Sequence, residues 1–516
     1  SVAVGLLLAS GCADVDAVGD EATVGAVDDA ERALVAQMPA VVVCSADDAT
    51  FYDAPDLTGK VDGALLKCRS LPGLSDLPGY ARYRVMYKSS VVVHRGAGGA
   101  TTETRPYAAT GEVYVPTGET VTPSDRPVIA SLHGLTGMRV DCAPSKRAPF
   151  GDRRLIDALG QGLAAAQPSQ GKPVLVVPDL LGQGTASGLW SSDRSYSLLD
   201  PLTFNTARRS PFSNIAHSYV SIESQGRATV DAVRAARSIG ASGLSASPRW
   251  FAVGESQGGH GALSVGEVVQ RGYGAELRLR GVIAGAPGSA LDDPNSALNP
   301  VKSFLVPNVI AGLSLEWPDI RPSQLLSNNA LLAYALTANT QCLSSTDQVG
   351  SWLVTFGAYV GSGSITRTNI EATLQNPTLA PALLANSPGH ARSLVPVFVA
   401  QVEGDPFILR QRTDNLVALE RTTNPGLVTY CVYNSPTTLS SPPLDPTKWS
   451  GWFNGVAGNH HPLARTLDKT PAQVLADPLP LIRQCSAPNG QPIAATTANA
   501  ASWHPVEWAK ARYLAP

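Results

Sequence analysis

From residue 127 onward, short runs of consecutive apolar residues alternate with segments of helical spacing. A continuous apolar run predicts a strand that is buried on both faces, as in a parallel sheet covered by helices. The predicted strands of this kind are Pro127–Leu132, Pro173–Asp179, Arg249–Val253, Gly281–Ala286, Val395–Ala400 and Val428–Tyr433. Helices are predicted at Ile215–Ile239, at residues 408–422 and directly after residue 256. This alternation predicts an α/β architecture.

Two earlier segments, Tyr83–Tyr87 and Gly111–Val115, instead alternate apolar and polar positions. Strict alternation is typical of half-buried strands. A Gly/Thr-rich loop separates the two segments.

The strand–helix rhythm stops between residue 294 and about residue 393, where the sequence is rich in Leu, Ala, Asn and Ser. An insertion near the carboxyl ends of parallel strands predicts a cap over a ligand site. We therefore expect a core of residues 39–293 and 394–516 and a mainly helical cap of residues 294–393. Trp317 and Trp352 either line a channel in this cap or form its core.

The chain has 516 residues, of which 44% are hydrophobic and 16% charged, a globular composition. Its formal net charge of −3 gives no indication of a nucleic-acid partner. Nothing in the composition indicates an oligomeric state.

The first twelve residues look like the end of an export signal, and Ala9-Ser10-Gly11-Cys12 resembles a bacterial lipobox. We expect Cys12 to be lipidated; the alternative is a cleaved signal peptide. Residues 13–38 are acidic and are predicted to form a tether. About a dozen apolar residues are too few for a transmembrane helix. The chain is thus predicted to be an exported bacterial protein, lipid-anchored at the cell surface or in the periplasm, or otherwise secreted.

Six further cysteines are expected to form three disulfides, because an even number in an exported chain is typical of a disulfide framework. They are Cys44, Cys68, Cys142, Cys342, Cys431 and Cys485. Fifteen pairings are possible, and spacing selects none of them. No C-x-x-C or H-E-x-x-H spacing occurs, so neither a metal nor a cofactor is predicted.

The motif with the most specific chemistry is Gly254-Glu255-Ser256-Gln257-Gly258. The pattern G-x-S-x-G between a strand and a helix forms a nucleophile elbow, which lifts the serine hydroxyl above the sheet. The N–H of Gln257, at the start of the helix, is then a predicted oxyanion donor.

A serine nucleophile requires a base, which follows it in the chain order of this fold. His460 is the preferred base, in a glycine-bearing loop after the late strands, and His461 is the alternative because Pro462 restricts its backbone. His260 and His504 are predicted to be structural, and His390 precedes the strand that should carry the acid.

The acid should follow the strand that contains Val395–Ala400. Asp405, at a turn before Pro406, is preferred over Glu403. Asp414 is disfavoured because it falls inside the following helix. The second oxyanion donor is expected in His133-Gly134-Leu135-Thr136-Gly137: the Leu135 N–H, with the Thr136 side chain as the alternative.

Five segments together resemble the secretory lipase family, the fungal lipase A type with bacterial members. They are Phe51–Pro55, Cys142–Ser145, Pro178-Asp179 with the Gly182/Gly184 loop, Gly254–Gly259 and Ala284–Pro287. The Asp405 and His460 loops extend the similarity to about residue 465. The chain departs from the family at Val402, where Gly is usual, and at His461-Pro462 after the expected base.

The resemblance implies an α/β-hydrolase fold with an inserted helical cap, activity on carboxylic esters including acylglycerols, and no cofactor. It also implies disulfides between Cys142 and Cys342 and between Cys431 and Cys485, which leaves Cys44 for Cys68.

Together these features predict an exported serine esterase or lipase with a Ser256–His460–Asp405 triad and an acyl-enzyme intermediate. A peptidase or acyltransferase with the same triad is one alternative, because fold does not select the reaction. A catalytically inactive surface-binding lipoprotein is the other. Acyl chain length is not predicted, because the cap determines the pocket.

Overall fold

A computed structural model of the 516-residue chain describes most of the core and part of the predicted cap. The described residues are 44–45, 50–72, 77–119, 126–147, 153–166, 168–185, 217–293, 305–321, 325, 342–343, 358, 362–435, 460–463, 466, 469–477 and 481–515. The predicted signal remnant, Cys12, the tether, Trp352 and much of residues 294–393 lie outside this set.

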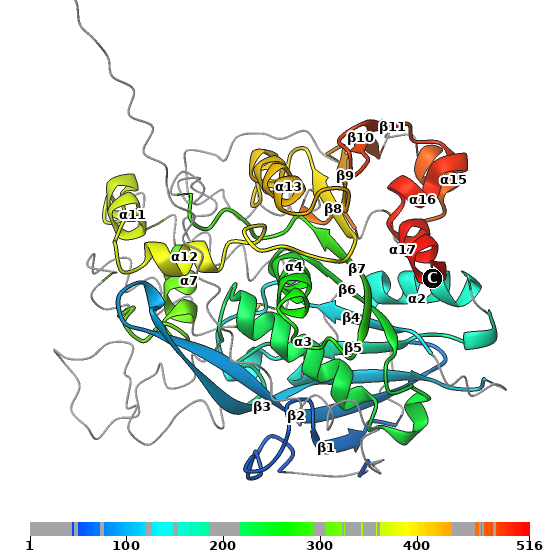
Figure 1. The fold of residues 1–516 in the computed structure, drawn as a ribbon, viewed down its shortest axis with the longest axis horizontal. Helices are drawn as coiled ribbons and strands as arrows, with labels where there is room; N and C mark the ends of the chain where they lie inside the picture. Colours follow the sequence, from blue (N-terminus) through cyan, green and yellow to red (C-terminus); the bar gives the residue numbers. More distant parts are fainter. Residues whose placement is uncertain are drawn as a thin grey trace, which may run out of the picture.

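One sheet of eleven strands, ordered β1-β2-β3-β5-β4-β6-β7-β8-β9-β10-β11, runs through the described structure (Figure 1). Its centre is parallel, as predicted, and β6 lies between β4 and β7. The parallel strands are β4 (Val128–Leu132), β5 (Val174–Pro178), β6 (Arg249–Glu255), β7 (Arg278–Gly285), β8 (Val397–Val402) and β9 (Val428–Tyr433). Each falls on a predicted apolar run.

Antiparallel strands flank this centre on both sides. They are β1 (Leu65–Ser70), β2 (Tyr80–Arg95) and β3 (Thr101–Pro116) on one side, and β10 (Ile482–Ser486) and β11 (Pro492–Ile493) on the other.

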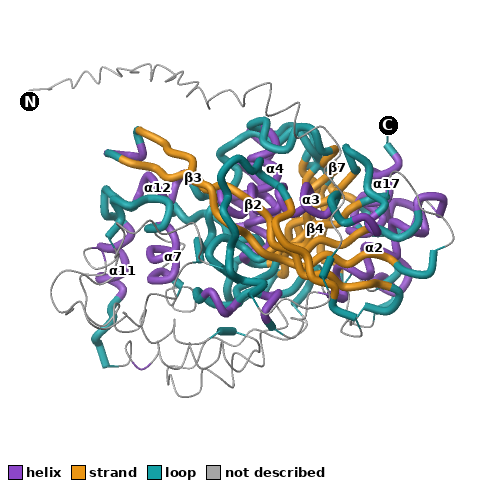
Figure 2. The backbone as a smooth tube through the Cα atoms, turned by 90° about the horizontal axis from the view of Figure 1, so that it is seen from below, coloured by secondary structure: helices purple, strands orange, loops and turns teal. Residues whose placement is uncertain are grey.

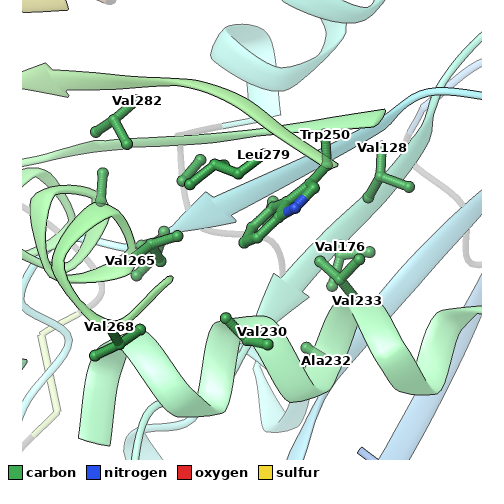
Figure 3. Packing of buried hydrophobic residues seen from close by; sticks show 14 of the residues in the cluster. Val128, Val176, Val230, Ala232, Val233, Trp250, Val265, Val268, Leu279 and Val282 are labelled. Carbon is green, nitrogen blue, oxygen red and sulfur yellow. The ribbon is translucent and has the colours of Figure 1, made fainter. Parts of the chain in front are cut away.

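Helices cover both faces of the sheet (Figure 2). On one face lie α3 (Ile222–Ala236), α4 (Gln257–Gln270) and α13 (Arg410–Thr423), and on the other α2 (Arg153–Ala166), α16 (Ala500–Trp503) and α17 (Pro505–Leu514). Successive side chains of β6 alternate between the two cores: Trp250 packs beneath α3 and α4 (Figure 3), whereas Phe251 packs with the second group. A strand with both faces buried is apolar throughout, which explains the continuous run.

The predictions for β2 and β3 were too short. Each strand has 16 residues, and the two pair in register from Tyr80 and Pro116 to Arg95 and Thr101. The outer half of β3 is exposed and polar, so apolar alternation did not reveal it. The helix predicted at Ile215–Ile239 begins only at Ile222, because Ser221 has extended φ/ψ and its side chain caps the Ser224 N–H.

The hairpin of β2 and β3 projects to the segment that follows α7 (Val306–Leu313). The His94 ring stacks on Trp317 at 4.3 Å between centroids, and the His94 N–H donates to the Glu316 carbonyl at 2.7 Å. Trp317 is buried in an apolar cluster with α7, α11 (Arg367–Leu374) and α12 (Ala380–Ala385). Trp317 therefore belongs to a packed core.

Three disulfides join Cys44 to Cys68, Cys142 to Cys342 and Cys431 to Cys485. These are the pairings that the family resemblance implies. Within the described residues, no helix is long and apolar enough to span a membrane.

Glu267 on α4 provides a test of this packing. Burial raises the pKa of Glu267 to about 8, and repulsion from Glu420 adds to the shift. The unfolded carboxyl titrates near pH ~4.3. Between these values the folded state holds a proton that the unfolded state has released, so stability falls as pH rises. We expect Glu267→Gln to reduce the loss of Tm between pH 6 and pH 9 by roughly 2–4 °C.

Thermal melts at intervals across this range measure the effect. Glu103→Gln, which changes an exposed carboxylate, should keep the wild-type dependence. Equal slopes for Glu267→Gln and wild type would contradict the assignment.

Candidate active site

Ser256 occupies a strained turn between β6 and α4. Its φ of 58° and ψ of −119° are unusual for a non-glycine residue. The flanking glycines permit this turn: a Cβ on Gly254 would lie 2.3 Å from the Gly258 oxygen, and one on Gly258 would lie 2.0 Å from the Leu132 oxygen. The start of α4 is thus pressed directly against the end of β4.

Asp405 and His460 are brought together from positions 55 residues apart. His460 Nδ1 lies 2.8 Å from Asp405 Oδ2, and both residues are buried. The N–H groups of Phe407 and Ile408 donate to Asp405 Oδ1 at 2.8 and 2.9 Å. These bonds orient the carboxylate toward the imidazole, an arrangement that suits an acid–base pair.

The two alternatives have other partners. Glu403 forms ion pairs with Arg483 and Arg410. His461 Nδ1 lies 3.2 Å from Glu255 Oε2, and its side chain is 47% exposed. Neither contacts the Asp405–His460 pair by a hydrogen bond between described residues, although the two histidine rings lie 5.3 Å apart.

Glu255 connects the elbow to the loop that carries His460. It directly precedes Ser256, is buried, and its Oε1 accepts from the Leu463 N–H at 2.6 Å. Together with its contact to His461, this places residues 461–463 against the end of β6. Ser256 and His460 therefore lie on segments that touch through their immediate neighbours.

The loop after β4 lies on the other side of the elbow, as Gly258 and Leu132 show. In this loop Thr136 is buried, its hydroxyl accepts from Gln183 Nε2 at 2.9 Å, and its carbonyl accepts from the Leu343 N–H at 2.7 Å. The Cys142–Cys342 disulfide holds the same two segments together. Leu135 packs against the apolar cluster of α7, α11 and α12.

His217 is a buried residue beside the elbow that the sequence interpretation missed. Gln257 Nε2 lies 2.5 Å from His217 Nε2, and His217 Nδ1 lies 3.1 Å from the Leu181 carbonyl. Nδ1–H must therefore donate to Leu181, and Nε2 must accept from the Gln257 amide. Burial lowers the pKa of His217 to about 3, so the ring is neutral and orients the side chain of Gln257. The search considered only histidines after Ser256 and so passed over it.

The remaining histidines have structural partners. His260 lies between Gln225 Oε1 at 2.8 Å and the Asn386 carbonyl at 2.9 Å, and burial lowers its pKa to about 4. His504 contacts the Lys469 carbonyl at 2.8 Å. His390 is 3.7 Å from Asp292. Among described residues, no group of three or more His, Cys, Asp or Glu could hold a metal ion.

Comparison with protein families identifies what this site resembles. Residues 213–419, which include the elbow and Asp405, match the family model described as secretory lipase. The chain is a member of the secretory lipase family. It is a hydrolase of the lipase/esterase class. No curated protein matches this secretory lipase by sequence.

Solved structures support the fold of this secretory lipase. Candida antarctica lipase A in its closed state matches at 17% identity and a TM-score of 0.50, covering 88% of this chain and 99% of that chain. A second structure of that lipase has 16% identity, a TM-score of 0.51 and coverage of 88% and 98%. The rice cell wall degrading esterase LipA from Xanthomonas oryzae matches at 15% identity and 0.48, covering 80% and 99%. The fold is thus the predicted α/β-hydrolase fold.

The contact between α4 and β4 can be tested at Gly258. A methyl group there would meet the Leu132 backbone oxygen, which cannot move without displacing the strand. We expect Gly258→Ala to lower the free energy of unfolding by about 3 kcal/mol.

Gly288→Ala is the matched control, because its Cβ would find ordinary contacts at 3.6–3.9 Å. It should change stability by less than about 0.5 kcal/mol. Urea titrations of both variants measure this; similar stabilities would show that the close approach is not a constraint.

Proposed function

We propose that this secretory lipase is an exported serine carboxylic-ester hydrolase with Ser256 as nucleophile, His460 as base and Asp405 as orienting acid. The buried 2.8 Å contact between His460 and Asp405 carries the proposal. A histidine held by a carboxylate on a loop that touches the nucleophile's strand is the arrangement that activates a serine.

In the proposed reaction, Ser256 Oγ attacks the ester carbonyl while His460 Nε2 takes its proton. Asp405 accepts from Nδ1–H and stabilises the imidazolium that forms. The protonated His460 then gives its proton to the leaving alcohol, which produces an acyl-enzyme. A water molecule, deprotonated by His460, hydrolyses this ester and releases the carboxylic acid.

The oxyanion that forms in each step is proposed to bind to the N–H groups of Gln257 and Leu135. The Gln257 N–H belongs to the first turn of α4, where backbone donors lack intrahelical partners. No described residue accepts a hydrogen bond from the Leu135 N–H. Thr136 is the alternative donor, because its hydroxyl accepts from Gln183 and keeps its own hydrogen available.

Esters with apolar acyl groups, including acylglycerols, are the proposed substrates. The family supports this class. Apolar residues also adjoin the site on both sides: Phe407 stands 5.0 Å from the His460 ring between centroids, and Leu135 joins the same apolar cluster. Residues 294–393 are proposed to cap this cluster.

Export is supported by the family and by the three disulfides, which persist in oxidising compartments. We further propose that Cys12, outside the described residues, is lipidated and that residues 13–38 tether the enzyme to a membrane.

Ser256→Ala should abolish hydrolysis of p-nitrophenyl esters, lowering kcat by about 10⁶ because the nucleophile is lost. A fluorophosphonate probe should label the wild-type enzyme at Ser256 and leave the variant unlabelled. Full activity of Ser256→Ala would refute the proposed mechanism.

Asp405→Asn should lower kcat by about 10³–10⁴ with little change in KM, because the amide no longer selects the His460 tautomer that accepts the serine proton. Asp414→Asn is the control, since that carboxylate contacts Tyr430 and Arg410 instead. Steady-state kinetics of both variants decide the role of Asp405. Near-equal kcat values would reassign the acid.

A further inference from the structure

The proposed triad leaves one buried charged group beside it unexplained. Glu255 ends β6, is 2% exposed and is not part of the proposed chemistry. A buried carboxylate is costly unless polar partners satisfy it. Its printed partners are two donors, and both lie on the short segment that begins with His460.

These donors lie one and three residues after His460. The Leu463 N–H is 2.6 Å from Oε1, and His461 Nδ1 is 3.2 Å from Oε2. Hydrogen bonds to an ionised carboxylate are stronger than those between neutral groups. Each oxygen of Glu255 thus holds a different residue of the base loop.

The surrounding packing leaves room for this contact. A Cβ on Gly285 would lie 2.8 Å from Leu463 Cγ and 2.9 Å from Glu255 Cγ. Gly285, the last residue of β7, therefore admits both side chains against the sheet. The Ser256 N–H in turn donates to the Gly285 carbonyl at 2.9 Å. Nucleophile, Glu255 and base loop meet at one glycine.

We propose that Glu255 is a positioning residue that fixes the distance between Ser256 and His460. This role rests on the proposed function. Asp405 orients the His460 ring from the β8 side, and Glu255 fixes the backbone after His460 from the β6 side. Because Glu255 is covalently next to Ser256, any shift of the base loop relative to the nucleophile must break its bonds.

The position of Glu255 predicts an effect on kcat and not on KM. A displacement of about 1 Å between catalytic groups can reduce the rate about 10²-fold. Glu255→Ala removes both bonds and should lower kcat by about 10², with KM within about twofold of the wild-type value. Glu255→Gln keeps an oxygen for Leu463 and should lower kcat by only about tenfold or less. This partial rescue distinguishes positioning from a requirement for charge.

Glu267→Gln is the matched control. Glu267 is a buried carboxyl on the helix that follows the elbow, and it likewise accepts a backbone N–H, that of Gly389 at 2.9 Å. Its partner belongs to a segment remote from His460 in sequence. At pH 7 this variant should keep kcat within about twofold of the wild-type value.

The experiment measures kcat and KM for a soluble p-nitrophenyl ester, the rate of fluorophosphonate labelling of Ser256, and Tm, on the full chain. The expected order of both kcat and labelling rate is wild type, then Glu255→Gln, then Glu255→Ala. If Glu255→Ala does not fold, a wild-type kcat in folded Glu255→Gln together with a wild-type labelling rate overturns the proposal. So does a loss confined to KM or Tm.

Ser256→Ala, measured in parallel, separates the two proposals. Inactive Ser256→Ala with fully active Glu255 variants refutes the positioning role and leaves the mechanism intact. Active Ser256→Ala refutes the proposed function itself.

Discussion

The contact between the first turn of α4 and the end of β4 is the constraint on which the site depends. It is a contact of backbone against backbone, with no space for a Cβ at Gly254 or Gly258. It holds Ser256 in a strained conformation that an isolated turn would not keep. The same contact brings the loop that contains Leu135 and Thr136 to the elbow. The strain at the nucleophile is therefore stabilised by the packing of the central sheet.

Carboxylates then assemble the rest of the site around this rigid centre. Asp405 and Glu255 are both buried, which is unfavourable unless donors satisfy them. Asp405 accepts from the two N–H groups that follow it, and Glu255 accepts from the loop near His460. Each charge is thereby used to hold a loop that lacks regular structure. A disulfide and the Thr136–Leu343 bond attach the inserted segment to the opposite side.

The sequence predicted what depends on local pattern. Apolar runs located the six parallel strands, because burial on both faces imposes an unbroken apolar composition. G-x-S-x-G located the elbow, because the turn restricts side-chain size. The outer halves of β2 and β3 were missed, since they extend beyond the core and are polar. The bonds between Glu255 and residues 461–463 join positions more than 200 apart, and no local pattern announces them.

The choice between Glu403 and Asp405 illustrates how the fold resolves what the sequence leaves open. Both carboxylates follow β8, only two residues apart. The Glu403 N–H still pairs with the Tyr433 carbonyl at 2.9 Å, so Glu403 continues the strand and its side chain reaches Arg483 and Arg410. The Asp405 N–H instead closes a turn onto the Val402 carbonyl at 3.3 Å. That turn reverses the chain, points Asp405 inward and presents the next two N–H groups to it, so that the carboxylate is already oriented where His460 arrives.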